Sequence, residues 1–172
     1  MKSNCVEGTD VTEKATFTRG LIHDVVVNPL RKFIDERGWL AELYRSDELA
    51  CDQMPVMAYI SMTQPGVARG PHEHVDQTDY FCFIGPSNFK IYLWDRREGS
   101  PTCGVRQTIY AGQDAPMMVI VPPGVVHAYR NVGGSDGIVF NGPNRLYAGE
   151  GKKSSVDEIR HEEVAGSPYH LD

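Results

Sequence analysis

Three of the six histidines have the spacing of side chains that act together. His72 and His74 are two residues apart, and because side chains alternate along a strand, both imidazoles would point to one face. Asp79 heads the next apolar run, and His127 follows a Pro-Gly turn at residues 123 and 124. Three imidazoles and a carboxylate suit one divalent ion, whereas an imidazole can instead act as a general base. These four residues therefore have three interpretations, which are metal binding, proton transfer and packing without a chemical role.

Short strands must position these side chains. Runs rich in Val, Ile, Tyr and Phe recur at close spacing, separated by Gly, Pro, Asn and Asp. Many short strands with turns between them are typical of a sandwich or barrel, and helical periodicity is weak throughout. The predicted strands cover residues 21–27, 39–45, 56–62, 80–84, 89–94, 104–109, 117–121, 125–130 and 137–140. Single helical turns are predicted at 46–50 and 154–160.

Length and composition favour one soluble β-domain. The chain has 172 residues, 41% of them hydrophobic, and a domain of roughly 150 residues hides about two-thirds of its unfolded surface. The formal net charge of -6, with acids and bases interspersed, argues against a nucleic-acid partner. The apolar runs are too short to cross a bilayer, and the N-terminus lacks the apolar segment of a signal peptide. We therefore expect a cytoplasmic protein without a membrane partner and with its four cysteines as free thiols.

Polar and apolar residues divide the chain into three parts. Residues 1–18 are polar and predict a flexible arm, and residues 19–147 contain the predicted barrel. Residues 148–172 carry charges and few apolar side chains, so we expect a tail that packs on or near the barrel mouth. The aromatic residues expected mainly in the core are Trp39, Phe81, Phe83 and Tyr129. The histidines outside any motif, expected at the surface, are His23, His161 and His170.

Two segments resemble the motifs of the cupin superfamily. Residues 66–85 resemble the pattern G-x5-H-x-H-x(3,4)-E-x6-G, with Asp79 in place of the glutamate. Residues 122–131 match P-x-G-x2-H-x3-N, although Pro116 stands where this second motif begins with glycine. The resemblance implies an all-β cupin double-stranded β-helix, which is a jelly-roll barrel. In metal-binding cupins the matching residues are the ligands, which here are His72, His74, Asp79 and His127.

The context of these motifs resembles a narrower family, the dTDP-4-dehydrorhamnose 3,5-epimerases. The family signatures read roughly D-x-R-G-x-x-x-E, G-V-x-R-G-x-H, D-x-R-x-x-S-P-T-x-G and P-x-G-x-x-H. The matching segments are 35–43 (DERGWLAEL), 66–72 (GVARGPH), 95–104 (DRREGSPTCG) and 122–127 (PPGVVH). They occur in the family's order, so together they are a specific signal.

The resemblance implies a substrate, a base and a set of binding residues. The family removes protons beside the ketone of a nucleoside diphospho-4-keto-sugar, which requires a base and stabilisation of the enolate. His72 aligns with the family's base, and His127 and Asp79 complete the predicted catalytic set. The predicted substrate-binding residues are Arg37, Glu42, Arg69, Tyr129, Asn141 and Tyr147. The resemblance also implies a reaction without a cofactor and a homodimer in which residues 21–27 extend the partner's sheet.

Two positions depart from the family pattern. Asp79 replaces a lysine that normally stabilises the enolate, and Asn141 replaces a tyrosine acid on a late strand. A carboxylate beside a developing enolate would destabilise it. An ion bound by the three histidines and Asp79 could restore the lost positive charge as a Lewis acid. A histidine that binds the ion, however, cannot also be a free base.

The sequence is compatible with three functions. The first is a dTDP-4-dehydrorhamnose 3,5-epimerase-like isomerase that needs no cofactor. The second is a metal-dependent cupin enzyme, an oxygenase or a sugar isomerase, with one Zn, Fe, Mn or Ni ion. The third is a non-catalytic cupin that binds a sugar or a nucleotide. The D-x-R-G and S-P-T-x-G segments favour the first function, whereas the loss of the lysine and tyrosine favours the other two.

Overall fold

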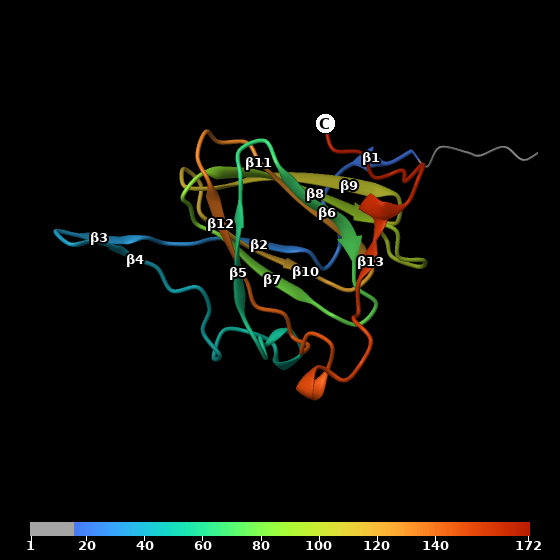
Figure 1. Cartoon of the computed structure of the whole chain (residues 1–172), viewed down its shortest axis with the longest axis horizontal. Coiled ribbons are helices and arrows are strands. Elements are labelled where there is room, and N and C mark those ends of the chain that lie inside the picture. The colour runs from blue at the N-terminus through green and yellow to red at the C-terminus, as the bar shows by residue number, and fades with distance from the viewer. Residues whose placement is uncertain (1–15) are drawn as a thin grey trace, which may run out of the picture.

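Two β-sheets pack face to face in the computed structural model, which describes residues 16–172 (Figure 1). The six-stranded sheet has the order β1 (Thr18–Arg19), β9 (Val105–Gly112), β8 (Asn88–Asp95), β11 (Val125–Asn131), β6 (Ala68–Glu73) and β13 (Ile159–Arg160). The five-stranded sheet has the order β2 (Val26–Pro29), β10 (Met117–Val121), β7 (Asp79–Phe83), β12 (Gly137–Asn141) and β5 (Tyr59–Thr63). The remaining elements are a hairpin of β3 (Phe33–Asp35) and β4 (Gly38–Leu40), and the short turns η1 (Cys51–Gln53), η2 (Glu150–Lys152) and η3 (His161–Glu163).

The strand order is that of a jelly roll. From β5 to β8, and again from β9 to β12, successive strands alternate between the two sheets. All pairings within the two sheets are antiparallel except that of β1 with β9. This confirms the predicted all-β jelly-roll barrel. No helix of the described residues is long and apolar enough to cross a membrane, and the cytoplasmic location stays a prediction.

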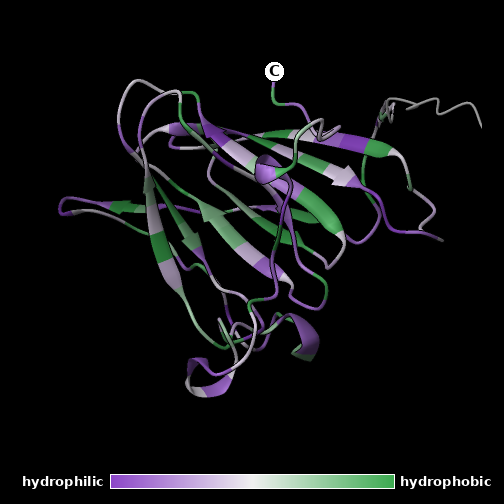
Figure 2. Ribbon diagram, turned by 45° about the vertical axis from the view of Figure 1, so that its right-hand side comes forward, coloured by the Kyte–Doolittle hydropathy of each residue, from purple (hydrophilic) through white to green (hydrophobic). Residues whose placement is uncertain are grey.

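The core lies between the inner faces of the two sheets. On β7 the alternation of side chains places Phe81 and Phe83 in this core, while Tyr80 and Cys82 pack on the outer face against Met118. Burying one phenylalanine side chain contributes about 1.5–3 kcal/mol. Figure 2 shows hydrophobic residues along the strands of both sheets. The sheets therefore form a stable frame for the polar residues at one end of the barrel.

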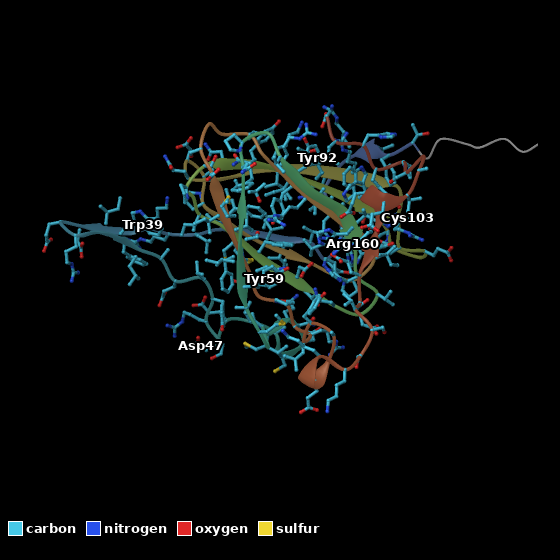
Figure 3. All side chains as sticks on the ribbon, in the orientation of Figure 1. Trp39, Asp47, Tyr59, Tyr92, Cys103 and Arg160 are labelled. Atoms are coloured by element: carbon cyan, nitrogen blue, oxygen red, sulfur yellow. The ribbon has the colours of Figure 1, made fainter. Side chains whose placement is uncertain are left out.

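The aromatic prediction holds for three of its four residues. Phe81, Phe83 and Tyr129 are buried in the core, whereas Trp39 is 52% exposed. Trp39 belongs to the β3–β4 hairpin, which projects away from both sheets (Figure 3). The hairpin lies far from the core of its own chain, so its apolar residues have no internal surface to pack against.

The predicted and observed strands differ where pairing overrides the local pattern. The strand expected at 21–27 begins only at Val26, and that expected at 39–45 ends at Leu40. Strand β6 is absent from the predicted strand ranges, because its sequence ARGPHE has no apolar alternation, although the H-x-H spacing implied a strand at residues 72–74. A turn does form at 46–48, where the Glu48 N–H donates to the Arg45 carbonyl, but it is not helical. The helical turn expected at 154–160 is wrong, since the short helical turns lie at 51–53, 150–152 and 161–163. Within 154–160 the chain instead forms β13, which pairs with β6.

The C-terminal segment returns across the six-stranded sheet. Tyr169 packs on Trp94 with ring centroids 5.5 Å apart. The carboxylate of Asp172 lies 2.9 Å from Lys90 Nζ and 2.8 Å from Arg106 Nη2. These contacts and β13 attach the end of the chain to the barrel. The predicted arm lies almost wholly in residues 1–15, outside the described residues.

Candidate active site

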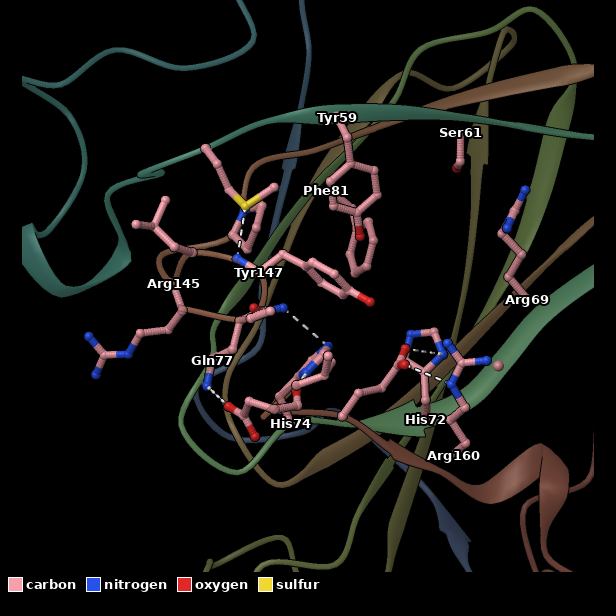
Figure 4. Close-up of a pocket in the computed structure, with 18 of the residues that line it drawn as sticks. Tyr59, Ser61, Arg69, His72, His74, Gln77, Phe81, Arg145, Tyr147 and Arg160 are labelled. Atoms are coloured by element: carbon pink, nitrogen blue, oxygen red, sulfur yellow. Dashed lines mark hydrogen bonds and ion pairs between the residues drawn. The ribbon is translucent and has the colours of Figure 1, made fainter. Parts of the chain in front are cut away.

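A cavity of about 550 Å³ opens between the sheets at one end of the barrel (Figure 4). Its walls come from both sheets, and the C-terminal segment covers one side. Residues that line it include Tyr59, Ser61, Arg69, His72, His74, Gln77, Phe81, Tyr129, Arg145, Tyr147, Asp157, Glu158, Arg160 and Glu162. The cavity therefore combines aromatic surface with acids, bases and arginines, the composition expected of a site for a polar small molecule.

The barrel brings the three motif histidines together. His72 on β6 and His127 on β11 are register partners, with ring centroids 4.5 Å apart. His74, which directly follows β6, has its ring centroid 5.9 Å from that of His72 and 5.8 Å from that of His127. Gly70 permits this packing, because a Cβ at Gly70 would lie 2.6 Å from the His127 carbonyl oxygen and 3.2 Å from His72 Nδ1. Its positive φ of 78° also favours glycine.

Asp79 lies beneath the histidines and is buried. Its Oδ2 is 3.2 Å from His74 Nε2 and 3.1 Å from His127 Nε2. Its Oδ1 accepts hydrogen bonds from Gln77 Nε2 at 2.9 Å and from Asn141 Nδ2 at 3.0 Å. A buried carboxylate requires such partners, because an unpaired one would be strongly destabilising. Asp79 therefore connects two histidines and two amides in one polar cluster.

The cluster separates the charge states of the histidines. Burial, and then the charge of His127, lowers the pKa of His72 to about 2, so its imidazole is neutral at pH 7. Burial opposes protonation of His74 as well, but the hydrogen bond and charge of Asp79 outweigh it and raise the pKa of His74 to about 9. Burial also opposes ionisation of Asp79, yet its close contacts with His127 and His74, and the charge of both rings, keep its pKa below the ordinary value. The His72 ring thus carries no proton at neutral pH, while the charges of Asp79 and His74 compensate each other.

The same residues could hold one metal ion. One ring nitrogen from each of His72, His74 and His127 lies within 4.8 Å of the others. The Nδ1 atoms of His74 and His127 bond the carbonyl oxygens of Asp157 and Val125, leaving each Nε2 to face Asp79. Metal-binding histidines are commonly oriented by such outer contacts. His127 Nε2 is buried, and although it is 3.1 Å from Asp79 it makes no well-directed hydrogen bond. The three imidazoles and the adjacent Asp79 carboxylate therefore have the chemistry and the spacing to bind one divalent ion.

Four of the predicted substrate-binding residues lie at the cavity or directly behind it. Arg69 lines it and donates to Thr63 Oγ1 at 3.1 Å and to the Met62 carbonyl at 2.9 Å. The Tyr129 hydroxyl is 2.9 Å from Ser61 Oγ. Tyr147 lines the cavity, and Asn141 is buried behind it, against Asp79.

Arg37 and Glu42 lie away from the cavity of their own chain. Arg37, with its side chain 82% exposed at the tip of the β3–β4 hairpin, pairs with Asp35. Glu42 lies 3.6 Å from Arg45, on the outer side of the five-stranded sheet. Their roles in binding stay predictions, and the geometry allows them only at a pocket other than their own. The D-x-R-x-x-S-P-T segment is structural within the chain, because Asp95 there accepts hydrogen bonds from Arg97, Ser100 and Thr102.

The structure adds residues that the sequence did not single out. Glu158 and Glu162 have carboxylate oxygens 3.8 Å and 4.0 Å from His72 Nδ1. Arg160 lines the cavity beside them. The pairing of β13 with β6 places these residues, and no local pattern in the charged tail signals it. The prediction of a surface position for His161 is wrong, because His161 is buried with its Nε2 2.9 Å from Glu73 Oε1.

Comparisons with known proteins agree on one family. The sequence model described as dTDP-4-dehydrorhamnose 3,5-epimerase matches residues 19–154. The chain is 38% identical over 128 residues to a Haloferax volcanii protein named as probable low-salt glycan biosynthesis epimerase Agl13, covering 73% of this chain and 81% of the relative.

Two solved structures show the same fold. A dTDP sugar isomerase from Desulfovibrio desulfuricans has a TM-score of 0.73 at 20% identity, covering 86% of this chain and 88% of the other. A dTDP-6-deoxy-D-glucose-3,5-epimerase from Legionella pneumophila, in complex with dTDP-4-keto-L-rhamnose, has a TM-score of 0.68 at 18% identity. This second match covers 84% of this chain and 76% of the other.

Proposed function

The chain belongs to the dTDP-4-dehydrorhamnose 3,5-epimerase family, and on that premise we propose that it epimerises a nucleoside diphospho-4-keto-sugar. The reaction removes a proton from a carbon beside the ketone and returns one to the opposite face. The names of the related proteins support an epimerase, and the motif order supports the same reading. No redox step occurs in such a reaction, so it proceeds with acids and bases alone.

The observation that carries this proposal is the place of His72 in the cavity wall, with two carboxylates beside it. Its imidazole lines the cavity, and its pKa is lowered to about 2 by burial and by His127. The ring is therefore free of a proton at neutral pH. A pKa this low also makes a weak base, so proton transfer from the substrate carbon depends on neighbours that stabilise the imidazolium. Glu158 and Glu162 lie within about 4 Å of Nδ1 and would stabilise the imidazolium that forms. General base catalysis of this kind contributes typically about 10²–10⁴-fold to the rate.

Stabilisation of the enolate requires positive charge near the ketone oxygen. The family lysine is absent, but the carboxylate that replaces it is neutralised by His74, whose pKa is raised to about 9. His74 lines the cavity next to His72. The His74–Asp79 pair is therefore close to neutral and does not oppose the enolate. We assign the positive charge near the ketone oxygen to Arg69 at the cavity wall, whose guanidinium suits phosphate or sugar oxygens.

We also propose that the enzyme is a homodimer. The β3–β4 hairpin projects from the barrel and exposes apolar residues, with Ile34 80% exposed and Leu40 64% exposed. Strand β2 lies at the edge of the five-stranded sheet, where a further strand could pair. A hairpin that reaches a second copy would bury this apolar surface. It would also carry Arg37 towards the partner's site, in agreement with its predicted role.

A second candidate function is that of a metal-dependent cupin enzyme. The grouping of His72, His74 and His127 within 4.8 Å, with Asp79 adjacent, favours it. Those four residues would hold one Zn, Fe, Mn or Ni ion. When bound, the ion would supply Lewis acidity towards a ketone oxygen. The family match favours the cofactor-free epimerase as the first candidate.

Exchange with heavy water tests the proposed function. Incubating the protein with dTDP-4-keto-6-deoxyglucose in D2O should place deuterium beside the ketone and generate an epimer, both visible by proton NMR. The His72→Ala variant should lose exchange and epimer formation by about 10²-fold or more. If the wild-type protein binds the nucleotide sugar but exchanges no deuterium, the protein is the non-catalytic cupin. If His72→Ala exchanges deuterium as fast as wild type, another residue is the base.

A further inference from the structure

Inversion at a carbon needs proton carriers on both faces of the substrate. A base that takes a proton and returns it to the same face restores the original configuration. His72 on β6 is the base in the proposed function, so a second group must protonate the carbon from the other side. We propose that Tyr59 is this second group, the general acid of the epimerase; the inference rests on the proposed function.

Tyr59 belongs to the wall of the cavity that faces His72. It is the first residue of β5, in the five-stranded sheet, whereas His72 belongs to the six-stranded sheet. Figure 4 shows the Tyr59 side chain pointing into the cavity from the side opposite His72. A sugar ring placed between the two walls would present one face to the imidazole and the other to the phenol. This arrangement is the one that inversion requires.

The hydrogen bonds of Asn141 leave the phenol proton of Tyr59 available. Asn141 and Tyr59 are register partners, and Asn141 Nδ2 lies 2.8 Å from the Tyr59 hydroxyl and 3.0 Å from Asp79 Oδ1. Because a carboxylate only accepts hydrogen bonds, the amide nitrogen of Asn141 must face Asp79. The same nitrogen donates its second hydrogen to Tyr59, whose oxygen is the acceptor. The hydroxyl keeps its own proton, and nothing within residues 16–172 accepts it.

The surroundings keep the phenol protonated until it reacts. Burial, followed by the charge of Asp79, raises the pKa of Tyr59 to about 12, although the hydrogen bond from Asn141 acts in the opposite sense. After the proton has left, that amide would donate to a phenolate oxygen, and hydrogen bonds to charged groups are the stronger ones. Asn141 is therefore a positioning residue, which orients the hydroxyl and stabilises its anion.

The other tyrosines at the cavity lack this arrangement. Tyr129 is only 5% exposed, and its hydroxyl pairs with Ser61. Tyr147 is about as exposed as Tyr59, at 56% against 48%, but no hydrogen bond among the described residues orients its hydroxyl. Tyr147 reaches the same cavity, as Figure 4 shows, and it provides a matched control for loss of a cavity phenol.

The proposed step conserves atoms and charge. The substrate C–H bond breaks, its proton passes to the His72 imidazole, and its electron pair forms the enolate. The Tyr59 O–H bond then breaks and a new C–H bond forms on the opposite face, which regenerates the ketone. The imidazolium loses its proton to water and the phenolate regains one from water. The net reaction is an isomerisation without any other reactant.

Measuring exchange and inversion in one experiment tests the proposal. Wild type, Tyr59→Phe and Tyr147→Phe are each incubated with dTDP-4-keto-6-deoxyglucose in D2O. Proton NMR follows deuterium entering the original sugar separately from the appearance of the epimer. Tyr59→Phe should keep exchange near the wild-type rate, because His72 returns deuterium to the same face, while epimer formation falls by roughly 10²–10⁴-fold. Tyr147→Phe should keep the wild-type ratio of epimer formation to exchange, because a change in substrate binding alters both rates together.

The retained exchange in Tyr59→Phe also shows that the variant is folded and binds the sugar nucleotide. Three results would overturn the role of Tyr59: inversion at the wild-type rate in Tyr59→Phe, loss of exchange and inversion together in that variant, or selective loss of inversion in Tyr147→Phe. A wild-type protein that shows no exchange would instead overturn the proposed function, and the role of Tyr59 with it.

Discussion

His72 and His127 are direct register partners on β6 and β11, and their rings lie edge to face with planes at 86°. Two imidazoles at a centroid distance of 4.5 Å repel each other when both are protonated. After burial, this repulsion is the largest cause of the low pKa of His72. His127 also contacts Asp79, so the proposed base His72 and the buried carboxylate belong to one electrostatic unit. Substitutions at His127 should therefore change the properties of His72 without touching the substrate.

Chelation separates the two candidate functions. We expect deuterium exchange into the sugar nucleotide to persist after protein purified without an affinity tag is dialysed against EDTA, because the epimerase needs no ion. Metal content, measured in parallel for wild type and His127→Ala, should be far below one ion per chain in both. Loss of activity that one divalent ion restores would favour the metal-dependent cupin, in which case Asp79→Lys should release the ion.

The Asp157 carboxylate should hold the C-terminal segment on the site. It accepts hydrogen bonds from the backbone N–H groups of Val75, Asp76 and Gln77 at 2.7, 2.8 and 2.9 Å. Hydrogen bonds to a charged group contribute about 1.5–3 kcal/mol each when buried, and less where water competes. Asp157→Ala should therefore speed amide hydrogen exchange at residues 75–77 by about tenfold or more and lower stability by about 1–2 kcal/mol.

Glu163→Ala is the matched control for that experiment. Its carboxylate lies on the same segment, is 67% exposed and, within residues 16–172, reaches only Arg160, at 3.5 Å. Amide exchange at residues 75–77 should stay unchanged in this variant. Equal protection of those amides in Asp157→Ala and wild type would show that the segment is held by β13 alone.

Because of Asp95, the free energy of unfolding should fall as the pH is lowered below about 4. Burial opposes its ionisation, but hydrogen bonds from Arg97, Ser100 and Thr102 outweigh burial and lower its pKa in the folded state. A group whose folded pKa is lowered stabilises fully above its unfolded pKa, about 3.9, and loses that contribution as pH falls towards the folded pKa. Breaking a buried pair costs roughly 3–5 kcal/mol, so Asp95→Asn should lose that much at pH 7.

Urea unfolding at pH 7, 5 and 3 measures this effect. The difference between wild type and Asp95→Asn should be full at pH 7 and 5 and smaller at pH 3. Asp136→Asn, at an exposed position, should match wild type throughout. If the difference in unfolding free energy between wild type and Asp95→Asn is as large at pH 3 as at pH 7, Asp95 stabilises the protein through packing and not through its charge.

The exposed hairpin should determine the oligomeric state. Ile34 and Trp39 are register partners on the hairpin, and they are 80% and 52% exposed. Ile34→Glu introduces a charge where a second copy would pack, so light scattering should give the mass of one chain, against two for wild type. Val75→Glu, at another exposed apolar position (64% exposed), should leave the mass unchanged. A monomeric wild-type protein at working concentration would contradict the dimer.

Local patterns in the sequence were sufficient for the barrel and for part of the site. The H-x-H spacing and the alternation of side chains on β7 depend on the two-residue period of a strand, and the turn before His127 depends on Pro123 and Gly124; both effects act over a few neighbours. Phe81, Phe83 and Cys82 accordingly lie on the faces that alternation predicts. The family signatures added His72 and Arg69, since these residues keep their spacing within continuous segments.

Only the tertiary structure decided which distant residues meet at the site. Glu158 reaches His72 because β13 pairs with β6, and Tyr59 reaches Asn141 because β5 pairs with β12. Each pairing joins segments about 80 residues apart, and no local period records such a partner. The negative charge of Asp79 would by itself destabilise an enolate. Folding places His74 beside Asp79, and the positive charge of His74 compensates it. The sequence by itself thus determined the fold, the family and the proposed base, whereas long-range strand pairing decided the partners of that base and the proposed acid.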